Sequence, residues 1–373
     1  MHRVTGVVLA AALAGGSCFV ALAPGAAATS SSTVVPVVCG ATLTHDTTLT
    51  HDLHCTTGPG LILLGNVSLN LGGHGIYGPG TAIPGYDAID VQGASGGSTT
   101  VTNGRIQNWL NGIVGGIGNV SALNVSHMKF THLGTAIATH GGVCTVSYSA
   151  FRFAEFGING QNSVDTVTRS TFYQVRTSIG NASGGGLQAS YDSFTAPAGP
   201  TNETLTGVNN VQGNSSIDHS TFHNIPNAVN SFSASENLTN VTIAGAVTGY
   251  SGDEMSGTLT NVVFSHDVTG IELRTLANVT VTHGQFQYNG TPIYLWPNTG
   301  GLPSKIDVAS STFSKNLGDG VNLDIPGSSL TSVHAFNNAG HGINAVAGTH
   351  DLGGNRAHGN AQSPQCIGVV CTP

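Results

Sequence analysis

A phenylalanine recurs along the chain at intervals of about 22 residues, at the end of short segments such as "YSAF", "RSTF" and "HSTF". Its column consists of Phe130, Phe151, Phe172, Phe194, Phe222, Phe264, Phe286 and Phe313, with Ile243 in the one gap. Repetition at a period of this length indicates a solenoid, in which each repeat forms one structural unit that packs against its neighbours. The column therefore predicts an internal stack of phenylalanine rings.

Two aliphatic columns accompany the phenylalanines. The first, five residues earlier, consists of Val125, Val146, Val167, Ala189, Ile217, Leu238, Leu259, Val281 and Val308. The second, seven residues later, consists of Ile137, Ile158, Ile179, Val229, Ile271 and Ile293, and is interrupted by Thr201 and Tyr250. Three apolar columns predict coils of several short strands, which bury a continuous core only when they stack. The Leu-x-x-Leu-x-Leu pattern of a leucine-rich repeat is missing.

The composition fits stacked coils and argues against other classes. Only 8% of the residues are charged, as expected where equivalent positions of neighbouring coils lie above one another and like charges would repel. The 53 glycines, together with asparagine, suit the left-handed corners of such coils. A hydrophobic content of 39% argues against disorder. Ten Lys and Arg residues are too few for a phosphate-binding stripe, so nucleic acid is not an expected partner.

The first 28 residues have the features of a secretory signal peptide. Arg3 precedes an apolar run over residues 7–22, and small residues end at Ala28. We expect cleavage after Ala28, a short extension over residues 29–38, and a single domain over residues 39–373. No later apolar run reaches the roughly 18 residues that a membrane span needs. The expected location is extracellular.

The two ends of the domain carry a family resemblance. The opening "CGATLTHDTTLTHDLHCTTGPG" and the closing "GGNRAHGNAQSPQCIGVVC", together with the repeat, resemble the secreted bacterial right-handed parallel β-helix proteins of the pectin-lyase-like superfamily. The resemblance implies an all-β, right-handed parallel β-helix of about a dozen coils, capped at both ends. We expect the protein to be a monomer. Because this superfamily includes lyases, hydrolases, epimerases and non-catalytic binders, the resemblance does not select a function.

The cysteines predict two local disulfides. Cys39 and Cys55 lie close together near the mature start, and Cys366 and Cys371 near the end. In an oxidising compartment each pair can form a disulfide. A β-helix has an open sheet edge at each end, and a disulfide there would hold the end of the chain in place. Cys144 is then left over, and we interpret it as a small buried apolar residue.

A block of histidines and aspartates stands in the first repeat, "THDTTLTHDLHC". Its polar residues are His45, Asp46, His51, Asp52 and His54. These residues could bind a metal ion, alone or together with Cys39 and Cys55. However, their spacing matches no zinc motif. The alternation around three leucines favours a polar capping coil instead. We therefore expect no cofactor; calcium is a further option that no motif indicates.

A mildly basic stretch consists of Lys129, Arg152, Arg169 and Arg176. Glu155 and Arg176 both stand four residues after a phenylalanine of the repeat, so they fall on adjacent coils and can pair. An exposed pair of this kind contributes about 0–1 kcal/mol. We interpret it as structural.

The segment "GTPIYLWPN" suggests a binding surface. Ile293 and Leu295 alternate with Tyr294 and Trp296, which predicts a strand with both aromatic rings outward. With the coils in register, one outward column comprises Phe232, Asp253, Arg274, Trp296 and Asp324, and a neighbouring column includes Glu272 and Tyr294. Aromatic rings pack against sugars, and carboxylates and arginine bind sugar hydroxyls or carboxylates. The expected partner is an extracellular polysaccharide, with the insertion at residues 297–305 walling one side.

The same strip contains candidate catalytic residues. Asp253 and Glu272 fall on neighbouring coils, where two carboxyl groups could flank a glycosidic bond. Arg274 could be the base of a β-eliminating lyase. The acidic cluster of calcium-dependent pectate lyases and the Asp-Pro-His-Glu motif of mannuronan epimerases are both absent, so no catalytic residue transfers from the family. The alternative is a non-catalytic structural or surface protein, in which these side chains would be covered or mutually paired.

Overall fold

The computed structural model describes residues 36–82, 85–93, 97–115, 120–199, 204–296 and 303–372. The chain divides into two units, Met1–Pro36 and Val37–Pro373, and only the second is considered below. The expected signal peptide lies outside the described residues. All regular elements in the described ranges are β-strands, so this part of the chain has no apolar helix of the length needed to cross a bilayer.

Each coil contributes one strand to each of three faces, which we call faces 1, 2 and 3. Face 1 consists of β1 (Ala41–Leu43), β4 (Leu61–Leu64), β7 (Asp87–Gln92), β14 (Thr177–Ala182), β17 (Thr206–Val211), β20 (Asn227–Phe232), β23 (Thr248–Asp253), β26 (Thr269–Leu273), β29 (Thr291–Leu295), β32 (Val321–Leu323), β35 (Ile343–Ala345) and β38 (Cys366–Ile367). Face 2 consists of β2 (Thr47–Thr48), β5 (Ser68–Asn70), β10 (Val143–Ser147), β12 (Val164–Thr168), β15 (Gly186–Ser190), β18 (Asn214–Asp218), β21 (Ser235–Thr239), β24 (Ser256–Thr260), β27 (Asn278–Thr282), β30 (Lys305–Ala309), β33 (Ser329–Thr331) and β36 (His350–Asp351). Face 3 consists of β3 (Leu53–His54), β6 (Gly75–Tyr77), β13 (Thr171–Tyr173), β16 (Ser193–Thr195), β19 (Thr221–His223), β22 (Thr242–Ala244), β25 (Val263–Ser265), β28 (Gln285–Gln287), β31 (Thr312–Ser314), β34 (His334–Phe336) and β37 (Arg356–His358). Three long strands run over more than one face: β8 (Gly97–Gly115), β9 (Val120–His140) and β11 (Ala150–Gln161).

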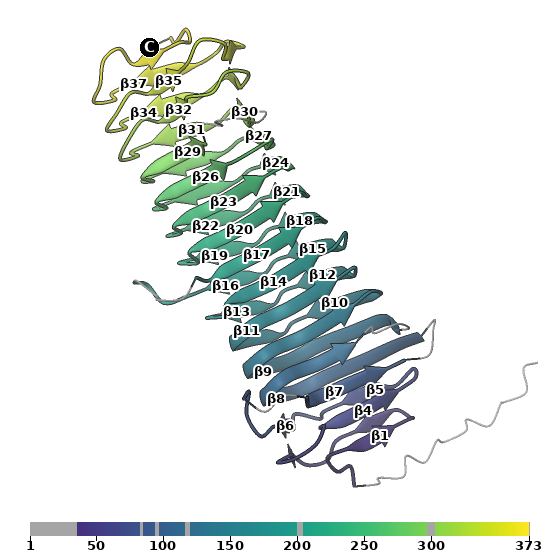
Figure 1. Cartoon of the computed structure of the whole chain (residues 1–373). Coiled ribbons are helices and arrows are strands. Elements are labelled where there is room, and N and C mark those ends of the chain that lie inside the picture. Colours follow the sequence, from purple (N-terminus) through teal and green to yellow (C-terminus); the bar gives the residue numbers. More distant parts are fainter. Residues whose placement is uncertain are drawn as a thin grey trace, which may run out of the picture. The chain divides into compact units, whose positions relative to one another are not determined.

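All strand pairs between successive coils are parallel, as the stack in Figure 1 shows. For example, β14 pairs with β17, β15 with β18, and β16 with β19. The result is a right-handed parallel β-helix of about 14 turns, slightly more than the dozen expected. The predicted fold class is confirmed.

The phenylalanine column forms the predicted stack inside the coils. Phe151, Phe172 and Phe194 are at most 1% exposed. Their ring centroids are 4.6 and 4.9 Å apart, and the interplanar angles are 5° and 7°. The aliphatic columns also align, because Val146 pairs with Val167 and Ile158 with Ile179. In one coil the prediction is wrong: the position between Ile179 and Val229, assigned to Thr201 from the spacing, is occupied by Val208. Nearly parallel, offset rings of this kind add to the stability that burial already provides.

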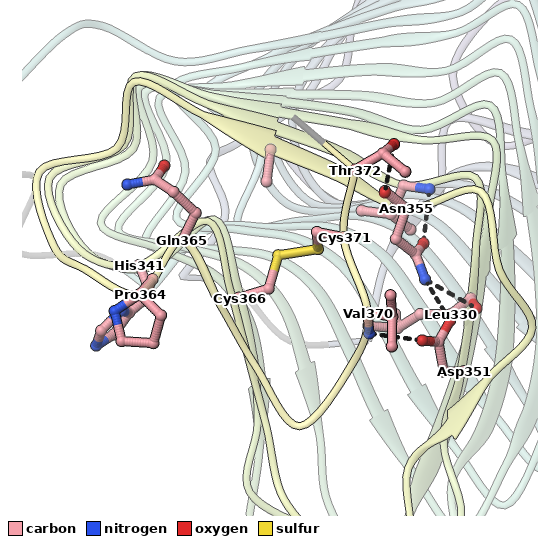
Figure 2. Close-up of a disulfide and its surroundings, with 12 residues drawn as sticks. Leu330, His341, Asp351, Asn355, Pro364, Gln365, Cys366, Val370, Cys371 and Thr372 are labelled. Carbon is pink, nitrogen blue, oxygen red and sulfur yellow. Dashed lines mark hydrogen bonds between the residues drawn. A yellow bond between two sulfur atoms is a disulfide. The ribbon is translucent and has the colours of Figure 1, made fainter.

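Both predicted disulfides are present at the ends of the domain. Cys39 and Cys55 have a Cα–Cα distance of 5.6 Å, and Cys366 and Cys371 one of 6.2 Å. Figure 2 shows the second disulfide and, on the far side of Val370, Asp351, whose carboxylate accepts a hydrogen bond from the Val370 backbone N–H at 2.7 Å. The C-terminal segment is thus fixed against the last coils, where the sheet would otherwise end in an open edge.

In the histidine and aspartate block of the first repeat, the two aspartates accept hydrogen bonds from backbone N–H groups of the next coil. Asp46 accepts a hydrogen bond from the Ser68 N–H at 2.8 Å, and Asp52 accepts one from the Gly75 N–H at 2.8 Å. The Gly75 contact is the main reason why the pKa of Asp52 is lowered. Within the described residues, no three His, Cys, Asp or Glu side chains are arranged to hold a metal ion. Asp46 and Asp52 thus join the first repeat to the second through backbone hydrogen bonds.

Cys144 lies on the inward side of β10, between Leu123 and Asp165 of the adjacent coils. It is fully buried, and this burial, with the nearby Asp165 carboxyl, raises the pKa of its thiol well above the ordinary value. A buried thiol with a raised pKa is a poor nucleophile. Its environment is that of a small apolar side chain.

We expect mass spectrometry after non-reducing digestion to recover Cys39 linked to Cys55 and Cys366 linked to Cys371. Cys144 should be recovered as a free thiol. Because it is buried, iodoacetamide should label it only after the protein has been unfolded. A bond to Cys144, or rapid labelling of the folded protein, would contradict the register around β10.

Candidate functional site

The predicted strip lies on face 1, over four adjacent strands. Phe232 at the end of β20 pairs with Asp253 at the end of β23. The register continues one residue beyond the next two strands, because the Arg274 N–H donates to the Gly252 carbonyl at 2.8 Å and the Trp296 N–H to the Leu273 carbonyl at 2.9 Å. The four outward side chains of this column, Phe232, Asp253, Arg274 and Trp296, are therefore on successive coils, and we call them the Trp296 strip.

The Trp296 indole is held in a defined position although 47% of the residue is exposed. Its Nε1–H donates a hydrogen bond to Glu272 Oε1 at 2.7 Å. The Arg274 guanidinium carbon lies 5.4 Å from the indole centroid, a cation–π contact. Tyr294 meets the indole edge-on, with centroids 5.7 Å apart. Three neighbours thus orient a ring that remains open to solvent.

Glu272 is the centre of these contacts. Its Oε1 also accepts hydrogen bonds from Arg274, at 3.0 Å from Nε and 2.9 Å from Nη2. Its Oε2 accepts a hydrogen bond from the Thr248 hydroxyl at 3.4 Å. The side chain of Glu272 is only 14% exposed, whereas that of Arg274 is 50% exposed. The arrangement leaves Glu272 as a hydrogen-bond acceptor and Arg274 as a paired cation.

The remaining predicted site residues lie on the coils before and after this centre. Phe232 is 40% exposed, and Asp253 is half-buried. Asp324 is exposed on the coil of β32 and accepts a hydrogen bond from the Asn322 amide at 3.0 Å. Neither Asp253 nor Asp324 forms an ion pair with a residue in the described ranges. The expected loop wall at 297–305 falls mostly outside the described residues, which omit 297–302.

Two contacts of this site were not predicted from the sequence. The column alignment places Glu272 beside the strip but does not show that its carboxylate joins Arg274 to Trp296. Thr248, which donates to that carboxylate, was not selected at all. The sequence signal for the first contact is residue spacing. Arg274 stands two residues after Glu272, just past the end of β26, and Trp296 occupies the equivalent position on the next coil.

No protein-family model matches the chain, and no curated protein matches it. Among solved structures, it is similar to the catalytic unit of a thermostable GH87 alpha-1,3-glucanase from Streptomyces thermodiastaticus strain HF3-3, with 12% identity and a TM-score of 0.41. That match covers 67% of this chain and 62% of the glucanase unit. The mannuronan C-5 epimerase AlgE6 A-module from Azotobacter vinelandii gives 11% identity and a TM-score of 0.30, covering 90% of this chain and 91% of the module. These values are too low to indicate what this chain binds or does.

Proposed function

We propose that this protein is secreted and binds an extended neutral polysaccharide along the Trp296 strip. The observation that carries the proposal is the half-exposed indole of Trp296, fixed by Glu272 and Arg274. An aromatic ring that is already oriented loses little conformational freedom when a sugar packs on it. The successive coils add Arg274, Asp253 and Phe232 in line, so the surface suits a chain of several sugars.

The charges of the strip favour a neutral polymer over an acidic one. Arg274 is already paired with Glu272, whereas Asp253 and Asp324 form no ion pair within the part of the chain that the structure describes. The surface is therefore acidic overall, and it would repel a polymer that carries a carboxylate on every sugar. Sugar hydroxyl groups, in contrast, can donate hydrogen bonds to Asp253 and Asp324.

The contacts suit binding better than bond cleavage. A lyase base must face its substrate, but the Arg274 guanidinium is directed to the Glu272 carboxylate, with 2.9 Å between Nη2 and Oε1. A general acid must reach the glycosidic oxygen, but Glu272 is only 14% exposed and accepts hydrogen bonds from both Trp296 and Arg274. We therefore assign Glu272 and Arg274 to the positioning of Trp296. The two disulfides support an extracellular location, since such bonds persist in oxidising compartments.

We expect Trp296→Ala to weaken binding to the preferred neutral polysaccharide at least about tenfold, equivalent to about 1.4 kcal/mol. The melting temperature should stay nearly unchanged, because the exposed ring contributes little to the core. A panel of neutral glucans, mannans and xylans, measured by affinity electrophoresis and calorimetry, provides the test. New reducing or unsaturated ends should be assayed in the same samples.

Tyr288→Asn is the matched control, since Tyr288 is 41% exposed at a corner away from the strip. It should leave binding unchanged. The proposal fails if the wild-type protein binds no member of the panel. It also fails if Trp296→Ala lowers the melting temperature sharply without affecting binding, because the ring would then be part of the core.

A further inference from the structure

Five planar side chains form an exposed ladder at the corner between faces 2 and 3. The ladder consists of His127, Tyr148, Arg169, Tyr191 and His219, one from each of five successive coils. The imidazole of His127 stacks on Tyr148 with centroids 5.1 Å apart, and Tyr191 stacks on His219 at 4.8 Å. Between them, the Arg169 guanidinium carbon lies 5.5 Å from the centroids of both tyrosines. The stack is continuous, and Tyr148 and Tyr191 are 50% and 54% exposed.

The backbone at these corners does not favour such residues. Tyr148, Arg169 and Tyr191 have φ angles of 49°, 49° and 59°, in the left-handed region where large side chains are strained. Other coils place Asn103, Asn240 and Asn261 at the same corner, and asparagine tolerates this conformation. A corner that asparagine fits is therefore occupied by large aromatic and basic side chains on consecutive coils. Stacking of the side chains offsets part of this backbone strain. Stacking alone does not require that one of these side chains be a cation, as Arg169 is.

Further basic side chains lie on the adjoining part of face 3. Lys129 projects outward from β9, and Arg152 projects from β11 over the ring of Tyr173, 5.8 Å from its centroid. Lys129, Arg152 and Arg169 make no ion pair with any residue that the structure describes. Two exposed carboxylates lie near this surface, and both have partners: Glu155 forms the predicted pair with Arg176 at 2.6 Å, and Asp218 contacts Nδ1 of the ladder residue His219 at 2.7 Å. On a chain with a net charge of −8, this surface has an excess of positive charge.

We propose that the ladder and the adjoining residues Lys129, Arg152 and Tyr173, together the aromatic–basic face, bind an acidic polysaccharide through its carboxylates. Carboxylates form their strongest hydrogen bonds with guanidinium groups. Arg169 uses one donor on the Tyr148 hydroxyl, at 2.9 Å, and its remaining donors can reach a ligand. The site is independent of the Trp296 strip, which lies on face 1 and on later coils; Figure 1 shows β13, β16 and β19 of face 3 on one side of the stack.

The stacking geometry also distinguishes between ligand classes. The rings of the ladder cover one another's faces, with interplanar angles of 11° and 15° in the two ring pairs, so their edges rather than their faces are turned to the solvent. Among these edge groups, His219 Nδ1 is already bonded to Asp218 at 2.7 Å. A single-stranded nucleic acid needs open aromatic faces for base stacking and a cation near most phosphates. An acidic polysaccharide needs hydrogen-bond donors spaced along an extended chain, which the coils repeat at about 4.8 Å.

The test uses polygalacturonate as the probe, with its fully methyl-esterified form as a matched neutral polymer. We expect the wild-type protein to bind the acidic form, to bind the ester at least about tenfold more weakly, and to lose affinity as sodium chloride is raised. Arg169→Asn should weaken binding about tenfold, and Tyr148→Asn/Arg169→Asn/Tyr191→Asn should abolish it. Asparagine already occupies this corner in other coils, so the melting temperature of both variants should be maintained.

The control is Tyr288→Asn/Lys315→Asn. It removes a similar exposed pair, in which the Lys315 ammonium lies 5.1 Å from the Tyr288 ring centroid, at a different corner. This variant and Trp296→Ala should bind polygalacturonate as the wild type does. The proposal is overturned if the triple asparagine variant retains binding, if the ester binds equally well, or if oligo(dT) binds more tightly than polygalacturonate. Failure of Trp296→Ala to alter neutral polymer binding would contradict only the proposed function.

Discussion

Phe172→Ala should lower the free energy of unfolding by about 3–5 kcal/mol, the usual cost of truncating a buried aromatic side chain. Phe172 is 1% exposed and stacks between Phe151 and Phe194. Its removal leaves a cavity that both neighbouring coils line, and the parallel strands on either side limit how far they can collapse into it. Denaturant titration followed by fluorescence or circular dichroism provides the measurement.

Two variants test whether position in the stack causes this effect. Phe172→Ile should cost clearly less than Phe172→Ala, since Ile243 occupies the same column in the native chain. Phe232→Ala should cost at most about 0.5 kcal/mol, because that ring is 40% exposed on face 1. A melting curve of Phe172→Ala that matches the wild type would be incompatible with the internal stack.

The fold could be predicted because the physical constraint repeats. In a parallel β-helix each inward position is stacked on its equivalents, so the sequence period and the strand register are the same quantity. Phe151 therefore pairs with Phe172 as the spacing of 21 residues requires. The longer step between Phe194 and Phe222 is also accommodated, because the added residues lie between β16 and β17 while the strands keep their register.

From the sequence, the candidate site could be predicted only as columns of outward side chains. Register fixes which coil and which face Arg274 and Trp296 occupy, but side-chain torsions decide what they contact. Periodicity gives no indication that Glu272 accepts hydrogen bonds from both. The corners show a second limit: glycine and asparagine were expected there, whereas Tyr148 and Arg169 adopt the same left-handed conformation. Contacts with neighbouring coils outweighed the local preference of the backbone.

Acidic residues inside the coils were also not anticipated. The inward column of face 2 that holds Cys144 and Leu187 continues with Asp165 and Glu236. Burial raises the pKa of Asp165 to about 6 and that of Glu236 to about 7, although hydrogen bonds from neighbouring side chains oppose the increase. Within the described residues, no Lys, Arg or His forms an ion pair with either carboxyl group. Ionisation of either carboxyl group is therefore a free-energy cost to the folded protein.

That cost predicts how stability depends on pH. The folded-state pKa of Glu236, about 7, lies above the ordinary value of 4.5, so the folded protein binds the proton more tightly than the unfolded chain. The associated stability is fully present below pH 4.5 and is lost as the pH rises through 7. Asp192 and Asp267, with pKa values that burial raises to about 7, should act in the same direction. The free energy of unfolding should consequently be lower at pH 8 than at pH 5.

Glu236→Gln should remove this dependence at one position. Glu236 is fully buried and accepts hydrogen bonds from the Ser215 hydroxyl and, at 3.2 Å, from the Asn210 amide, contacts that the neutral and nearly isosteric glutamine can largely preserve. At pH 8 the variant escapes the cost of a buried charge, which a shift of this size sets at about 3 kcal/mol. At pH 5 the wild-type carboxyl is already protonated in the folded state, so the advantage should be much smaller. Urea titrations at both pH values, with the exposed Asp324→Asn as control, measure the difference. Equal pH dependence in Glu236→Gln and the wild type would show that water or a cation reaches Glu236 inside the coils.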